Sequence, residues 1–186
     1  MPFRPTGIPD LLVYEPRVHG DERGYFFESY NANTFGDEGI KIQFVQDNQA
    51  RSTYGVLRGL HFQLGPYAQT KLIRTLEGRI LDVVVDLRTG SPAYGKVFSI
   101  ELSAENKLQL LVPQGFAHGY SVLSPTAEVM YKCDNFYNKT SEGGILYNDP
   151  ALGIDWGIPL SDAVVSEKDK VLPLFANVQH NFTYQQ

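Results

Sequence analysis

The chain has 186 residues, about the length of one domain. Hydrophobic residues make up 42% and aromatic residues 12% of the chain, enough to fill a core, which excludes a disordered protein. The formal net charge is −5, with no lysine or arginine run and no apolar stretch of about 18 residues, which argues against nucleic-acid and membrane binding. The N-terminus has no apolar signal segment, so we expect one cytoplasmic domain over residues 1–186.

Short segments rich in Val, Ile, Leu, Phe and Tyr follow one another at intervals of about ten residues, with turn residues between them. This pattern predicts an all-β protein, a jelly-roll-type barrel with short peripheral helices. Strands are expected at 42–46, 72–76, 80–87, 97–102, 108–112, 120–123 and 128–133. In 81–87, Leu and Val alternate with Asp82, Val84 and Asp86, which predicts a half-buried strand.

Helical patterns occur only near the two ends of the chain. Residues 31–36 are expected to form one or two helical turns. The pattern Ser-Glu-Lys-Asp at 166–169 is typical of a capping box, which predicts a short C-terminal helix that Pro173 ends. One cysteine, Cys133, excludes an intrachain disulfide and a zinc site of several cysteines.

Two of the four histidines, His61 and His118, lie in apolar segments flanked by glycines. Both segments are expected to be strands, in which burial would favour the neutral imidazole. A neutral imidazole can be a general base, a metal ligand or a hydrogen-bonded core residue. The local sequence leaves these alternatives open.

The segment Pro-x-Gly-x-x-His that ends at His118 resembles the second motif of the cupin superfamily. The spacing from Gly55 to His61 resembles the start of the first cupin motif. Gln63 stands where that motif has its second histidine, and Lys71 stands where it has a glutamate. A protonated lysine repels a metal ion, so the resemblance implies a cupin pocket without metal. On local sequence alone, Lys71 would be read as a surface lysine.

A longer ordered set of motifs resembles one family, the dTDP-4-dehydrorhamnose 3,5-epimerases, over roughly residues 5 to 175. The motifs include Asp21–Glu28, Gln46–Asn48, Gly55–His61, Gln69–Leu72, Asp82–Arg88, Gly115–Gly119, Tyr131–Lys132, Asn148–Pro150, Ile154–Trp156 and Lys168–Asp169. The resemblance implies a cupin fold, a dTDP-linked 4-keto-6-deoxyhexose as substrate, a homodimer, and no metal or other cofactor.

The resemblance also implies the catalytic roles. His61 is expected to be the base that removes a proton next to the ketone, with Asp169 orienting it. Asp169 also occupies the last position of the capping box, and both roles remain open. Tyr131 is expected to be the acid, although without the motif a core tyrosine would be the better reading. Lys71 is expected to stabilise the enolate oxygen, a role inferred from its charge and position.

The remaining positions carried over from the resemblance are expected to bind substrate. The cations expected to bind the diphosphate are Arg23, Arg58, Lys71 and Lys168. The residues expected to form hydrogen bonds with the substrate are His118, Gln46, Asn48, Glu28 and Glu142. Tyr137 is expected to stack its ring on the thymine. Each charged residue could instead be a solvated surface residue. Arg58 and His61 are three residues apart and should face opposite sides of a regular strand, so a bulge at Gly59 is expected.

Three other functions stay open. A mono-epimerase acting on another dTDP-4-keto-6-deoxyhexose would share the base, acid and lysine. A metal-dependent cupin enzyme is opposed by Gln63 and Lys71. A non-catalytic sugar-binding cupin would bind nucleotide sugars without exchanging their protons with solvent.

Overall fold

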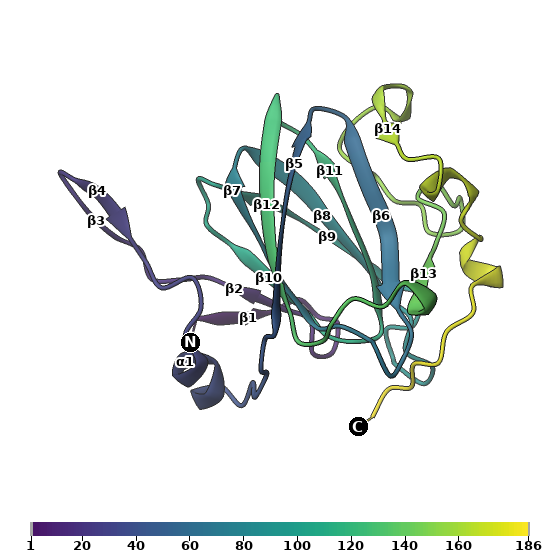
Figure 1. Cartoon of the computed structure of the whole chain (residues 1–186), viewed down its shortest axis with the longest axis horizontal. Coiled ribbons are helices and arrows are strands. Elements are labelled where there is room, and N and C mark those ends of the chain that lie inside the picture. The colour runs from purple at the N-terminus through teal and green to yellow at the C-terminus, as the bar shows by residue number, and fades with distance from the viewer. Residues whose placement is uncertain (1, 186) are drawn as a thin grey trace.

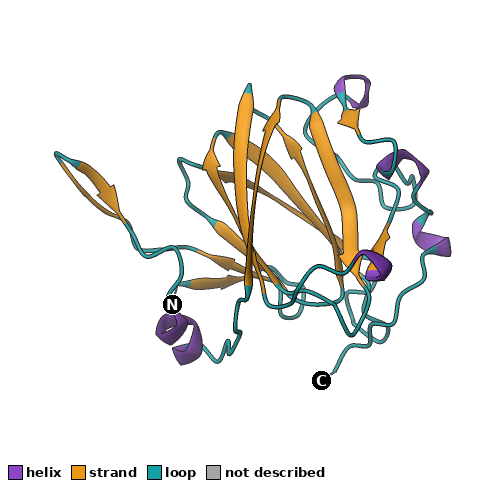
Figure 2. Cartoon of the chain, viewed as in Figure 1, coloured by secondary structure: helices purple, strands orange, loops and turns teal. Residues whose placement is uncertain are grey.

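Two facing β-sheets make up most of the chain, with loops and short helices around them (Figures 1 and 2). The structure is a computed structural model that describes residues 2–185. One sheet has the order β1-β2-β10-β7-β12-β5, with bounds β1 Phe3–Pro5, β2 Leu12–Tyr14, β10 Gln109–Val112, β7 Lys71–Glu77, β12 Thr126–Cys133 and β5 Gln46–Thr53. The other has the order β13-β6-β11-β8-β9, with bounds β13 Glu142–Gly144, β6 Val56–Gln63, β11 Phe116–Val122, β8 Arg79–Asp86 and β9 Val97–Ser103, and β14 Val164–Val165 pairs with β6.

The all-β prediction is confirmed, but the sheets are not closed into a barrel. Within residues 2–185 no ladder joins the two six-stranded sheets, so the jelly roll is a sandwich with open edges. Between the sheets lies an apolar core that includes Ile73, Ile80, Leu102, Leu110 and Val129. Burying these side chains is the main stabilisation of the sandwich, because apolar burial contributes about 25 cal/mol per Å².

Most of the expected strands are present with bounds shifted by one to four residues, but the strand at 42–46 is not. The strand there, β5, begins at Gln46. Ile42 and Phe44 instead pack on the outer face of the first sheet, beside the buried Phe35 of helix α1 (Ala32–Asp37). Residues 42–44 therefore cover this cluster without pairing in a strand, and Ile42 and Phe44 are half-buried.

Strand β8 is buried on both faces, so the half-buried prediction is wrong. Val84 packs in the core between the sheets, while Val83 and Val85 pack on the opposite side with Trp156 and Ile158. The C-terminal part of the chain covers that outer face, which alternation within one strand cannot reveal. Its short 3-10 helices are η2 Leu160–Asp162, η3 Asp169–Val171 and η4 Phe175–Asn177, and η1 Lys139–Ser141 precedes β13.

The predicted helices differ in outcome. Helix α1 confirms the first, with the Asn31 side chain accepting a hydrogen bond from the Asn33 N–H. At the start of the second predicted helix, the Ser166 hydroxyl accepts a hydrogen bond from the Asp169 N–H at 3.2 Å, as a capping residue should. Only the single turn η3 follows, because the chain continues in extended form from Leu172 into Pro173.

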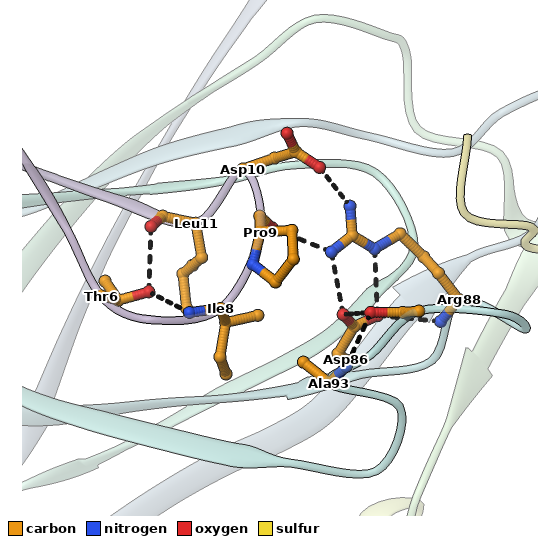
Figure 3. Close-up of polar contacts among 9 residues, drawn as sticks. Thr6, Ile8, Pro9, Asp10, Leu11, Asp86, Arg88 and Ala93 are labelled. Carbon is orange, nitrogen blue, oxygen red and sulfur yellow. Dashed lines mark hydrogen bonds and ion pairs between the residues drawn. The ribbon is translucent and has the colours of Figure 1, made fainter. Parts of the chain in front are cut away.

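An arginine cluster fixes the loop between β1 and β2 against the second sheet (Figure 3). The Arg88 guanidinium donates to the Asp86 carboxylate, to Asp10 at 2.7 Å and to the Pro9 carbonyl at 2.9 Å. It also lies over the Phe116 ring at the start of β11. The cluster therefore connects the N-terminal segment to the strand that carries His118.

A two-stranded hairpin, β3 (His19–Asp21) and β4 (Gly24–Phe26), projects away from the sandwich (Figure 1). Tyr25 and Phe26 on this hairpin are exposed. At the N-terminus, β1 is the outermost strand of its sheet. No helix within residues 2–185 is both long and apolar enough to cross a membrane.

Candidate active site

A cavity of about 450 Å³ lies against the inner faces of both sheets. His61, Lys71, His118 and Tyr131 line it, and Arg58 and Lys168 extend its polar wall. A second hollow of about 340 Å³ shares His61, Lys71 and Tyr131 and continues past Gln46, Asn48, Tyr137 and Glu142. The two hollows therefore form one elongated cleft, with the predicted catalytic residues where they meet.

A bulge in β6 brings Arg58 and His61 to the same cavity, as expected. On β11, His118 pairs with His61 and Tyr120 pairs with Arg58. Two residues of β6, Gly59 and Leu60, therefore stand opposite the single residue Gly119 of β11. Gly59 has φ +121, and a Cβ there would come within 2.6 Å of the Gly119 Cα. Any other residue at position 59 would push the strands apart and misplace both side chains.

His61 forms a close pair with Asp169. The Nε2 of His61 lies 2.7 Å from Oδ1 of Asp169, whose other oxygen accepts from the Gly59 N–H at 3.3 Å. Burial alone would raise the pKa of Asp169, which is 3% exposed, but the hydrogen bonds and charge of His61 hold it below its usual value. The ionised carboxylate has no proton to donate, so Nε2–H donates and Nδ1 is left unprotonated in the neutral ring.

Asp169 takes part in two contacts, one within the short turn and one with His61. Its backbone N–H is capped by Ser166, while its carboxylate binds His61 and Gly59 rather than the start of the turn. The short turn η3 therefore serves to present this carboxylate to β6.

Lys71 and Tyr131 lie together on neighbouring strands, β7 and β12. The Lys71 Nζ is 5.8 Å from the centre of the Tyr131 ring. Burial lowers the pKa of Lys71, and the charges of Cys133 and Asp82 oppose that change. Burial raises the pKa of Tyr131 to about 12, so the phenol keeps its proton at neutral pH. A lysine ammonium and a protonated phenol in one cavity can stabilise an anion and supply a proton.

The structure reveals one pair that the sequence analysis missed. His118 Nε2 lies 2.9 Å from Oδ2 of Asp82, and both side chains are buried. Asp82 was assigned to a half-exposed face of β8. The usable signal was a carboxylate in an otherwise apolar strand, since a buried charge requires a partner.

Several predicted binding residues meet at the other end of the cleft. Glu142 accepts from the Lys168 ammonium at 2.5 Å, and this bond is the main reason its pKa is lowered. Gln46 donates to Asn48 and accepts from the Tyr137 N–H at 3.1 Å. The Tyr137 side chain is 55% exposed, which leaves a ring face free for a ligand.

Arg23 and Glu28 do not reach this cleft within one chain. Arg23 lies on the projecting hairpin, 86% exposed, and its guanidinium pairs with Asp21. Glu28 is exposed and accepts from the Asn31 side chain at 3.0 Å. Among residues 2–185 no group of three or more His, Cys, Asp and Glu side chains is placed to hold a metal ion.

Residues 5–177 match the family model described as dTDP-4-dehydrorhamnose 3,5-epimerase. The chain belongs to this family. A dTDP-4-dehydrorhamnose 3,5-epimerase of Shigella flexneri is 54% identical over 165 residues, covering 88% of this chain and 90% of that protein. The crystal structure of the Elizabethkingia anophelis 3,5-epimerase has 55% identity and a TM-score of 0.91, covering 94% and 96% of the two chains. A Legionella pneumophila 3,5-epimerase in complex with dTDP-4-keto-L-rhamnose has 43% identity and a TM-score of 0.94, covering 99% and 98%.

Proposed function

We propose that this chain is an isomerase that inverts C3 and C5 of dTDP-4-dehydro-6-deoxy-D-glucose to give dTDP-4-dehydro-L-rhamnose, a step in dTDP-L-rhamnose biosynthesis. The observation that carries the proposal is the close His61–Asp169 pair in one cavity with Lys71 and Tyr131. Family membership supports it, as does the Legionella relative in complex with dTDP-4-keto-L-rhamnose. We assign the reaction to the cytoplasm and to one catalytic domain.

The chemistry follows from the C4 ketone, which acidifies the protons on C3 and C5. His61 removes such a proton, and Asp169 stabilises the imidazolium that forms. The C–H electron pair becomes the enolate, whose oxygen carries negative charge next to the Lys71 ammonium. Tyr131 then delivers a proton to the carbon from the opposite face, and the ketone is restored with inverted configuration.

Lys71 is expected to act mainly on the rate. Replacing it with methionine keeps the bulk of the stem and removes the charge, so kcat should fall about 10²–10³-fold, the usual loss for one oxyanion donor. Lys132→Met is the matched control, because Lys132 pairs with the exposed Asp47 outside the cavity. Steady-state kinetics that show equal losses for both variants would contradict the assignment.

The diphosphate and the nucleoside of the substrate are assigned to residues that line the two hollows of the cleft. Arg58, Lys168 and His118 supply positive charge or N–H donors for the diphosphate and sugar. Gln46, Asn48 and Glu142 supply hydrogen bonds, and Tyr137 supplies a ring face for thymine.

Loss of the Tyr137 ring should weaken nucleotide binding. Base–aromatic stacking is worth about 1–3 kcal/mol by alanine substitution, so Tyr137→Ala should raise the Kd of dTDP by roughly 5- to 150-fold. Tyr54→Ala removes a half-exposed tyrosine elsewhere and should leave the Kd unchanged. Calorimetry decides the point, and an unchanged Kd for Tyr137→Ala would make this residue structural.

The protein is proposed to be a homodimer in which Arg23 serves the partner's cleft. The support is the placement of Arg23 on a projecting hairpin, away from the cleft of its own chain, together with the open edge of β1. Light scattering should give twice the chain mass of 20.9 kDa. A mass of one chain across micromolar concentrations would overturn the dimer and remove Arg23 from the binding site.

A mono-epimerase is the neighbouring alternative. A 3'-monoepimerase from Streptomyces bikiniensis has a TM-score of 0.88 at 31% identity, less than the 43% and 55% of the two 3,5-epimerase structures above. Proton NMR of the product separates the two, because coupling constants around the ring report the configuration at C3 and C5. Inversion at both carbons supports the proposal, inversion at one supports the alternative, and unchanged substrate contradicts both.

A further inference from the structure

The segment that carries Tyr137, residues 134–138, is held in place by hydrogen bonds to other parts of the chain. The Asp134 carboxylate accepts from the Thr70 N–H at 2.6 Å, and Gln69 donates to the Asn135 carbonyl at 2.8 Å. Between β12 and η1 the segment has no regular secondary structure of its own. Its position therefore depends on these contacts rather than on a helix or a strand ladder.

Gln63 makes more of these contacts than any other side chain. Its Oε1 accepts from the Asn138 N–H at 2.6 Å. Its Nε2 donates to the Phe136 carbonyl at 3.2 Å and to the Tyr67 carbonyl at 2.7 Å. The bonds to Phe136 and Asn138 hold the two residues on either side of Tyr137, and Gln46 accepts from the Tyr137 N–H itself.

Gln63 is 7% exposed and is two residues after His61 on β6, so both side chains face the cleft. In the cupin motif this position holds a metal-binding histidine. Here the amide is directed to the backbone on both sides of Tyr137, and its acceptor and donors are occupied. The residue connects the catalytic strand to the loop at the nucleotide end of the cleft.

We propose that Gln63 is a positioning residue for nucleotide recognition, which holds the Tyr137 ring where a base can stack on it. This inference rests on the proposed function, in which Tyr137 contacts the thymine. A half-exposed ring on an unrestrained loop would lose conformational freedom when the base binds. Fixing the loop beforehand removes that cost and raises affinity for the nucleotide.

The test compares Gln63→Met with Gln109→Met in the whole 186-residue chain. Methionine keeps the unbranched shape and removes the hydrogen bonds of the amide. Gln109 is also a buried glutamine, which donates to the Ser29 carbonyl at 2.8 Å but lies outside the cleft. Binding of dTDP and of inorganic pyrophosphate is measured by calorimetry, each in the wild-type and Tyr137→Ala backgrounds.

We expect Gln63→Met to weaken dTDP binding about tenfold and Gln109→Met to leave it unchanged. Pyrophosphate has no base, so its affinity should not respond to Gln63→Met. In the Tyr137→Ala background, Gln63→Met should cause little further loss of dTDP affinity, because contacting residues that act together are not additive. In turnover, KM should rise by a larger factor than kcat falls.

Gln63→Glu is a second variant. Its carboxylate can still accept from the Asn138 N–H, but it has no N–H to donate to the carbonyls of Tyr67 and Phe136. This variant should also weaken dTDP binding. Equal losses for dTDP and pyrophosphate, or additive losses with Tyr137→Ala, would overturn the inference. So would a failure of both Gln63 variants to fold, because Gln63 would then serve the fold alone. Wild-type protein that does not bind dTDP would instead reject the proposed function.

Discussion

Replacement of His61 by asparagine is expected to abolish both solvent exchange and epimerisation of the substrate. An amide cannot accept the proton from C3 or C5, and a general base contributes about 10²–10⁴-fold. Asparagine keeps a polar group that can donate to the buried Asp169 carboxylate, so the fold should survive. The rates are measured in deuterated water by NMR, with circular dichroism to check folding.

His118 is the rival base, because it too lines the cavity and is paired with a buried carboxylate, Asp82. If His61→Asn retains solvent exchange near the wild-type rate, the base assignment is wrong and His118 becomes the first replacement. His180→Asn provides a matched control, since His180 lies outside the cavity beside Tyr94 and should keep full activity.

Tyr131→Phe is expected to separate exchange from inversion. The base still works, so the C–H bond still breaks and the enolate still forms beside Lys71. The proton is then returned mainly by His61, on the face that it left, so deuterium enters with little inversion. Epimerisation should fall about 10²–10⁴-fold relative to exchange, the usual loss for one proton donor.

The ratio of the two rates is the readout, because a general loss of structure would lower both. The raised pKa of Tyr131, about 12, means that the wild-type phenol should stay protonated and active as an acid well above neutral pH. Equal losses of exchange and inversion in Tyr131→Phe would show that the two residues do not divide the work as base and acid. A wild-type rate of inversion would remove Tyr131 from the mechanism.

The motifs predicted the centre of the site because its residues are fixed by local geometry. The spacing from Gly55 to His61 indicated a cupin strand, and the parity of Arg58 and His61 required the bulge that β6 contains. Lys71 at the motif's glutamate position was expected to face the cavity, where the structure places it. These inferences depend on short stretches of sequence, in which side-chain direction follows from strand periodicity.

The features that the sequence did not predict depend on contacts between segments that are distant in the chain. Alternation in β8 assigned Asp82 to a half-exposed face, but this face, which Asp82 shares with Val84, is buried against the other sheet, so the pairing of Asp82 with His118 was missed. Ile42 and Phe44 have the composition of a strand, but they are half-buried where they pack beside Phe35. Arg23 matched a binding motif, yet its hairpin projects away from the sandwich of its own chain.

The position of solvent deuterium in the product tests the central claim most directly. Wild-type protein is incubated with dTDP-4-dehydro-6-deoxy-D-glucose in deuterated water, and the sugar is examined by NMR. If inversion proceeds by proton removal next to the C4 ketone, deuterium will replace hydrogen at both C3 and C5, with inverted configuration at both carbons. Inverted product without deuterium at these carbons, or recovered substrate without deuterium, would contradict the account.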